Sequence, residues 1–164
     1  MVSAMPVVPP VVPPKVQAGS WKTVLVVDPD KEQRARVIRL LREAAGDDGK
    51  NASRRLAVRE ADNGNLAWTL IETAKPDMVV CEILLEGLSG MQLLRRLRER
   101  YQKQAPRVLI ATHMGNEVDR YWALRNGAAA FVVKPFEDEF FRERSAKLLT
   151  GDELDFDSHW PSEI

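Results

Sequence analysis

The 164-residue sequence contains one cysteine, two histidines and no long apolar run. The single cysteine, Cys81, excludes an internal disulfide and a cysteine-based zinc site, as is typical of proteins in a reducing compartment. His113 and His159 lie far apart and have no partner at ligand spacing, so a histidine metal site is not expected. No stretch approaches the ~20 apolar residues needed to span a bilayer, and prolines interrupt the start of the chain where a signal peptide has an apolar core. We therefore expect a cytoplasmic protein with no membrane contact.

The sequence also lacks a net charge, because it contains 24 Lys and Arg against 24 Asp and Glu. No overall field therefore draws the chain toward nucleic acid. We interpret the arginine-rich run LLRRLRER (93–100) as the solvated face of a helix, not as a phosphate-binding patch. No G-x-G-x-x-G or P-loop spacing is present, which argues against a nucleotide site. Hydrophobic content of 45% and charged content of 29% are typical of one globular domain.

The two ends of the chain differ in composition from the middle. Residues 1–20 contain five of the ten prolines, in PVVPPVVPP, and we expect a disordered, extended leader. That leader is either a flexible tail or a ligand for an aromatic-lined groove. Residues 150–164 are acidic around Phe156 and Trp160, and this tail either folds on a partner or has no function of its own. The domain is expected to span residues 21–149.

Between these ends, short β-branched apolar runs alternate with amphipathic segments. Strands are predicted at 23–27, 56–60, 77–82, 107–112 and 129–133. Helices are predicted to begin near Asp30, with Gln33 as a capping partner, and to cover 63–75, 90–102, 117–127 and 137–149. In the second helix we expect Leu66 and Ile71 to face inward. This alternation predicts an α/β fold with a doubly wound, five-stranded parallel sheet.

Polar side chains follow or end four of the five predicted strands. They are Asp28, Glu82, Thr112 and Lys134. Parallel sheets place their sites at the carboxyl ends of the strands, so we expect these four to converge. Carboxylates hold Mg²⁺ or accept a phosphoryl group, while a hydroxyl and an ammonium bind phosphoryl oxygens. The pattern is typical of a site for phosphoryl chemistry.

Four motifs in order resemble the receiver domain of bacterial response regulators. They are VLVVDPD (24–30), PDMVVCEILLEGLSG (76–90), VLIATHMGNEVDRYWALRNGA (108–128) and AAFVVKPF (129–136). The resemblance implies a flavodoxin-like (βα)5 fold, a non-enzymatic role in two-component or phosphorelay signal transduction, and a cis peptide before Pro135. It also implies that Glu82 stands at the phosphoacceptor position. Thr112 and Phe131 would be the switch residues and Lys134 the phosphate-gripping amine.

The sequence departs from the family's pattern at two chemical positions. The family places Asp where Glu82 stands, and Pro29 replaces one of two adjacent acids that hold a metal. The Glu carboxylate lies roughly 1.5 Å further out, and misplacement by about 1 Å costs around a hundredfold in rate. We therefore expect no catalytic residue and no cofactor. A weak Mg²⁺ site at Asp28, Asp30 and Glu82 is not expected either, although Asp28 and Asp30 would leave a residual acidic pocket.

The resemblance and its departures together predict an atypical pseudo-receiver. It would be phosphorylation-independent and would act by protein–protein interaction in a signalling pathway. Glu82 either imitates a phosphorylated acceptor or forms a structural ion pair with Lys134, and Thr112 is either the switch hydroxyl or an ordinary strand-end residue. Interface candidates are Tyr121, Trp122 and Arg125. One form of this interaction would be a homodimer, formed through the helix at 117–127, the strand at 129–133 and the helix at 137–149.

An enzymatic alternative comes from the same first motif. VLVVDPD also resembles the opening of haloacid-dehalogenase-like phosphatases, in which Asp28 would be the nucleophile and Asp30 the general acid. Two features argue against it. Lys31-Glu32 stand where those enzymes have Gly-Thr, and Glu137-Asp138 is expected to begin a helix instead of ending a strand.

Overall fold

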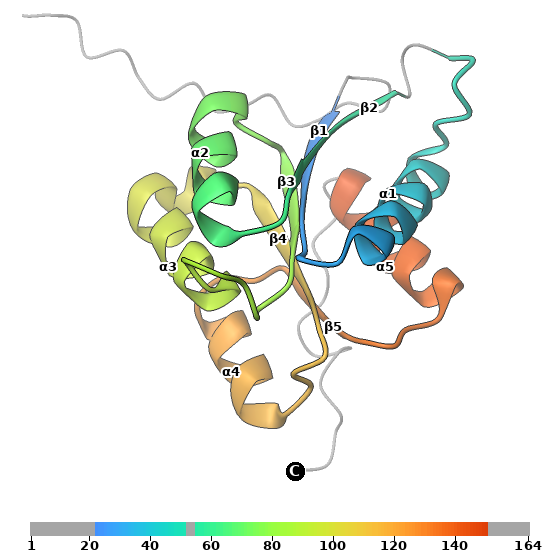
Figure 1. The fold of residues 1–164 in the computed structure, drawn as a ribbon. Coiled ribbons are helices and arrows are strands. Elements are labelled where there is room, and N and C mark those ends of the chain that lie inside the picture. Colours follow the sequence, from blue (N-terminus) through green and yellow to red (C-terminus); the bar gives the residue numbers. More distant parts are fainter. Residues whose placement is uncertain (1–21, 52–54, 151–164) are drawn as a thin grey trace, which may run out of the picture.

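The computed structural model describes residues 22–51 and 55–150, which form a parallel sheet flanked by helices (Figure 1). The predicted leader at 1–20 and the acidic tail beyond Thr150 lie outside the described residues. The strands are β1 (Lys22–Val27), β2 (Leu56–Ala61), β3 (Met78–Cys81), β4 (Arg107–Thr112) and β5 (Ala130–Val133), in the order β2-β1-β3-β4-β5. All neighbouring strands in this sheet are parallel. The predicted flavodoxin-like α/β fold is confirmed.

Helices cover both faces of the sheet. They are α1 (Lys31–Ala45), α2 (Gly64–Ala74), α3 (Gly90–Tyr101), α4 (Glu117–Arg125) and α5 (Asp138–Thr150), with a short 3-10 helix η2 (Gln102–Gln104) after α3. Helices α1 and α5 lie on one face, and α2, α3 and α4 lie on the other (Figure 1). Each face packs its own apolar cluster against the sheet. Within the described residues, no helix is both long and apolar enough to cross a bilayer.

The start of α1 differs from the predicted capping arrangement. Asp30 caps the helix as expected, because its Oδ1 accepts from the backbone N–H groups of Glu32 at 2.9 Å and Gln33 at 3.3 Å. The predicted return contact from the Gln33 side chain is wrong. The Asp30 N–H already donates to Asp28 Oδ1 at 2.9 Å, and Gln33 Oε1 is buried with no hydrogen-bond partner in the described part of the chain.

The inward face of α2 is rotated relative to the prediction. Ile71 is buried as expected, but Leu66 is 41% exposed, so its predicted inward position is wrong. The cause is Gly64, where a Cβ would lie 1.8 Å from the carbonyl oxygen of Leu88. This close contact with the loop before α3 buries the helix face that holds Gly64, Ala67 and Ile71, and a face with that spacing turns Leu66 outward.

The loop from β3 to α3 is held tightly against the sheet. Ser89 caps α3 in a capping box with Gln92, and the Gly90 N–H donates to the Ile83 carbonyl at 2.9 Å. A Cβ at Gly90 would lie 2.3 Å from the Glu82 carbonyl oxygen, so glycine is required where the helix begins. The backbone around Glu82 is therefore held in place by the close contacts of Gly90 with the carbonyl groups of Glu82 and Ile83.

Candidate functional site

Four polar side chains meet at the carboxyl edge of the sheet. Asp28 follows β1, Glu82 follows β3, Thr112 ends β4 and Lys134 follows β5. Each is no more than 6% exposed, although all carry polar or charged groups. The β1, β3 and β4 strands lie side by side, and β5 pairs with β4, so the sheet order brings these ends together. The structure therefore joins the four residues that the strand pattern singled out.

Glu82 has hydrogen-bond donors at both carboxylate oxygens. Its Oε1 accepts from the Thr112 hydroxyl and from the N–H groups of Ile83 at 2.8 Å and Leu84 at 3.3 Å. Its Oε2 accepts from Lys134 Nζ at 2.9 Å. A buried carboxylate with this many donors is stabilised in its charged form.

Lys134 bridges two acids. Its ammonium donates to Asp28 Oδ2 as well as to Glu82 Oε2, and its backbone N–H donates to the Thr112 carbonyl at 2.8 Å. The second oxygen of Asp28 accepts from the Asp30 N–H. Asp30 itself is exposed and uses its side chain to cap α1, so the structure does not bring its carboxylate to the cluster.

Burial and hydrogen bonds within this cluster shift the pKa values of Glu82 and Lys134. Burial opposes ionisation of Glu82, but hydrogen bonds from Thr112 and Lys134 outweigh it, so the pKa of Glu82 lies below its ordinary value. Burial likewise acts to lower the pKa of Lys134, and the hydrogen bonds to Asp28 and Glu82 outweigh it and raise that pKa. Burial also raises the pKa of the Cys81 thiol, which keeps this side chain protonated and unreactive.

These shifts predict how the stability depends on pH. Because the Glu82 pKa is lower in the folded state, its contribution is present above the unfolded value of about 4.3 and is lost as the pH falls through the folded pKa. The raised Lys134 pKa contributes stability below about 10.4, which is lost as the pH rises further. We expect Glu82→Gln to lower the free energy of unfolding by about 1–3 kcal/mol at pH 7, and by less in acid. Urea unfolding of the wild type and of Glu82→Gln at pH 3 and pH 7 measures this difference. If Glu82→Gln lowers the free energy of unfolding equally at both pH values, Glu82 does not have the lowered pKa.

The donor set at this edge does not fit a resident Mg²⁺ ion. Pro29 offers no ligand at the position where the family resemblance implies one, and it is exposed. The carboxylates of Asp28 and Glu82 are both paired with the Lys134 ammonium. No group of three or more His, Cys, Asp or Glu with metal-binding geometry occurs among residues 22–51 and 55–150.

Phe131 lies on β5, the strand that leads to Lys134. It pairs in register with Ile110 of β4, is half-buried against the apolar cluster of that face, and has the Arg120 guanidinium 5.5 Å from its ring centroid. Thr112 and Phe131 therefore lie on neighbouring strands of the sheet.

The predicted interface residues are exposed on α4. Tyr121 is 47% and Trp122 is 52% exposed, and their rings meet edge to face with centroids 5.3 Å apart. Arg125 is exposed too, and its carbonyl accepts from Arg98 Nη1 at 2.7 Å. Sequence reasoning did not single out Val118, which is 65% exposed and lies one turn before Trp122. The spacing 118, 121, 122 and 125 would have found this face.

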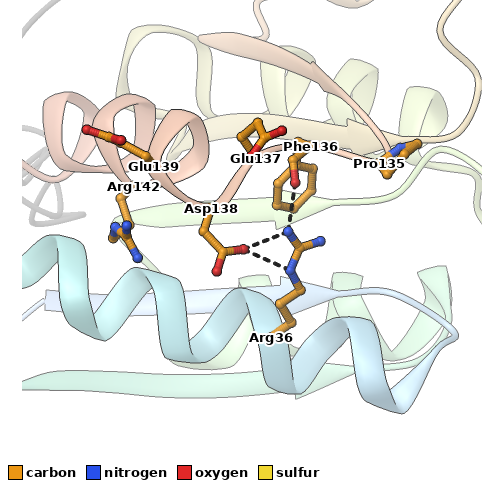
Figure 2. A pocket seen from close by; sticks show the side chains of 7 residues that line it. All are labelled: Arg36, Pro135, Phe136, Glu137, Asp138, Glu139 and Arg142. Atoms are coloured by element: carbon orange, nitrogen blue, oxygen red, sulfur yellow. Dashed lines mark hydrogen bonds and ion pairs between the residues drawn. The ribbon is translucent and has the colours of Figure 1, made fainter.

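An open pocket of about 470 Å³ lies between α1 and the start of α5 (Figure 2). It is lined by Arg36, Pro135, Phe136, Glu137, Asp138, Glu139 and Arg142. Figure 2 shows the Arg36 guanidinium reaching Asp138, to which it donates at 2.7 Å, and the carbonyl of Phe136. The Arg36 guanidinium in this pocket is thus already paired with Asp138. The two residues are 102 positions apart, so no local sequence pattern predicted their contact.

Comparison with known proteins places this geometry in context. The family model described as response regulator receiver domain matches residues 24–145. The chain is 33% identical over 94 residues to protein PilH of Pseudomonas aeruginosa, covering 57% of this chain and 78% of PilH. It is 30% identical over 133 residues to the alkaline phosphatase synthesis transcriptional regulatory protein PhoP of Bacillus subtilis, covering 81% of this chain and 50% of PhoP. This chain thus spans half the length of that regulator.

Solved structures agree on the fold. A putative response regulator from Chloroflexus aurantiacus superposes with a TM-score of 0.62 at 29% identity, covering 78% of this chain and 97% of that one. The chemotaxis response regulator CheY4 of Vibrio cholerae gives 0.65 at 20% identity, covering 79% and 99%. The cis peptide between Lys134 and Pro135 is present, as the resemblance implied. The phosphatase alternative finds no support in these relatives, and α5 begins at Asp138, where that alternative requires the rim of a strand.

Proposed function

The chain belongs to the response regulator receiver domain family, and we propose that it is an atypical receiver that acts without being phosphorylated. Receiver domains work in two-component signalling through protein partners. The negative charge at the acceptor position of a receiver comes either from phosphoryl transfer or from a side chain of the protein itself. The proposal is that Glu82 supplies it permanently.

The bonding of Glu82 carries the proposal. Both of its carboxylate oxygens accept hydrogen bonds inside the protein, and its side chain is only 6% exposed. A nucleophile for in-line transfer needs an oxygen directed at the incoming phosphorus, with little tolerance for misplacement. It also needs a cation to neutralise the transferred charge, and Pro29 removes a ligand for that cation. The site therefore favours a static carboxylate over an acceptor.

The same bonding suggests what the carboxylate does. Glu82 contacts Thr112 and Lys134, the two residues to which the family resemblance assigns the grip on a phosphoryl group. An ion pair with Lys134 and an imitation of the phosphorylated acceptor are therefore compatible in one geometry. The imitation is partial, since a phosphate carries about −1.5 to −2 charges and three oxygens. We propose that Glu82 holds Thr112 and Lys134 in one fixed arrangement.

Output would pass through the exposed face of α4. Tyr, Trp and Arg dominate the energetics of protein interfaces, and Tyr121, Trp122 and Arg125 all lie on this helix. We propose that this face, with β5 and α5, contacts a protein partner or a second copy of the chain. Binding of nucleic acid and enzymatic turnover are not part of the proposal.

Incubation with acetyl phosphate and Mg²⁺, followed by intact-mass measurement, tests the proposal. We expect no phosphoryl adduct on the wild-type chain, while a receiver with aspartate at the acceptor position, treated in parallel, is modified. A stoichiometric adduct that is lost in Glu82→Ala would overturn the proposal. An adduct lost instead in Asp28→Asn would revive the phosphatase alternative.

A further inference from the structure

The arginines of α1 and α3 differ in their partners. On α1, Arg34, Arg36, Arg39 and Arg42 each form an ion pair, at 3.1, 2.7, 3.1 and 2.8 Å. On α3, the arginines at 95, 96, 98 and 100 form no ion pair with any carboxylate in residues 22–51 and 55–150. We call these four residues the α3 arginine face. With Glu99, which is exposed among them, they form a surface that carries three more positive than negative charges, on a chain with no net charge.

Aromatic rings lie within this face. The Arg96 guanidinium is 5.6 Å from the Trp68 ring centroid, and that of Arg100 is 5.6 Å from the Tyr101 ring. The two rings are 6.4 Å apart, and both are half-buried. Exposed guanidinium groups beside partly accessible rings suit a peptide that carries both carboxylates and aromatic side chains.

The C-terminal segment of the chain has that chemistry. Residues 151–164 hold five of the 24 acidic residues and none of the 24 Lys and Arg. The acids are interleaved with Phe156 and Trp160. Residues 1–150 therefore carry an excess of positive charge that is balanced only by this segment.

The position of α5 makes contact feasible. In a parallel sheet each helix returns the chain from the carboxyl ends of the strands to their starting edge, so α3 and α5 end at the same edge. They lie on opposite faces of the sheet (Figure 1). The 14 residues after Thr150 span at most roughly 46 Å when extended, so the later residues of the segment have the greater reach, up to roughly 33 Å for Trp160.

We propose that the acidic segment 152–163 binds the α3 arginine face of its own chain. Its carboxylates would pair with the arginines, and its aromatic side chains would pack near Trp68 and Tyr101. This contact does not depend on whether Glu82 is phosphorylated. It makes the segment an internal ligand that any external anionic partner of α3 must displace.

Paramagnetic relaxation in the full-length chain tests the proposal. Ser158→Cys carries a nitroxide, and the native Cys81 stays unlabelled because it is buried. We expect selective loss of amide signal along α3, with none on α1. Raising the ionic strength from about 0.01 M to about 1 M shortens the Debye length from about 30 Å to about 3 Å and should restore the signals.

Matched variants assign the contact. Arg96→Glu with Arg100→Glu should restore the α3 signals, whereas Arg55→Glu with Arg59→Glu, the same charge change beside and on β2, should not. Asp155→Asn with Asp157→Asn should also restore them without altering the folded domain. Signal loss elsewhere, or α3 signal loss that survives the Asp155 and Asp157 changes, would overturn the proposal. So would loss in a mixture of spin-labelled and isotope-labelled chains, since the contact would then come from a second copy.

Discussion

Replacing Lys134 by methionine is expected to lower the free energy of unfolding by about 3–5 kcal/mol at pH 7. The substitution removes the ammonium that Asp28 and Glu82 share and leaves two buried carboxylates without their cation. In this variant the pKa of Glu82 rises, because burial still opposes its ionisation while the hydrogen bond and the charge of Lys134 that lowered this pKa are gone. The deficit should therefore be largest above about pH 5 and shrink as the pH falls toward about 4.

Urea unfolding at several pH values measures this effect, and an exposed lysine supplies the control. Lys147 lies 3.8 Å from Glu143 in an exposed pair, and Lys147→Met should change stability by no more than about 0.5 kcal/mol. Adding Asp28→Asn to Lys134→Met should recover part of the loss, since one of the two repelling charges is removed. If Lys134→Met costs as little as Lys147→Met, the buried cluster is not a major source of stability.

Introducing aspartate at positions 29 and 82 is expected to make the chain accept a phosphoryl group. With Pro29→Asp and Glu82→Asp together, acetyl phosphate and Mg²⁺ should yield one phosphoryl group per chain, where we expect none on the wild type. The shorter side chain withdraws the acceptor oxygen by roughly 1.5 Å, and a shift of about 1 Å is worth around a hundredfold in rate. The carboxylate introduced by Pro29→Asp adds an oxygen ligand for the metal beside Asp28.

The single variants separate the two contributions in the same intact-mass assay. Glu82→Asp alone should react slowly, and Pro29→Asp alone should stay unmodified. Pro29→Ala with Glu82→Gln controls for loss of the proline and of the acceptor carboxylate without adding a shorter acid. A double-aspartate variant that unfolds in urea like the wild type yet gains no phosphoryl group would show that another feature blocks transfer.

Local sequence patterns predicted the order of the elements and the four residues of the cluster. Buried parallel strands appear as uninterrupted apolar runs, so the residues that end or follow these runs were identifiable as members of one sheet edge. Asp28, Glu82, Thr112 and Lys134 were found in this way. The exposed arginines of α3 agree with the interpretation of the run at 93–100 as the solvated face of a helix.

Long-range contacts decided what those residues do. The ion pair between Lys134 and Glu82 was one of the two roles expected of Glu82, but no local pattern predicted that the same ammonium also binds Asp28, 106 residues away. Asp30 lies outside the buried cluster because its carboxylate accepts hydrogen bonds from backbone N–H groups at the start of α1. Leu66 is exposed because the face of α2 that holds Gly64 packs against the Leu88 carbonyl. The arginines of α1 and α3 are alike in sequence, yet within the described residues only those of α1 form ion pairs with carboxylates. Charge pairing is decided by which surfaces the fold brings together, and that information exists only in three dimensions.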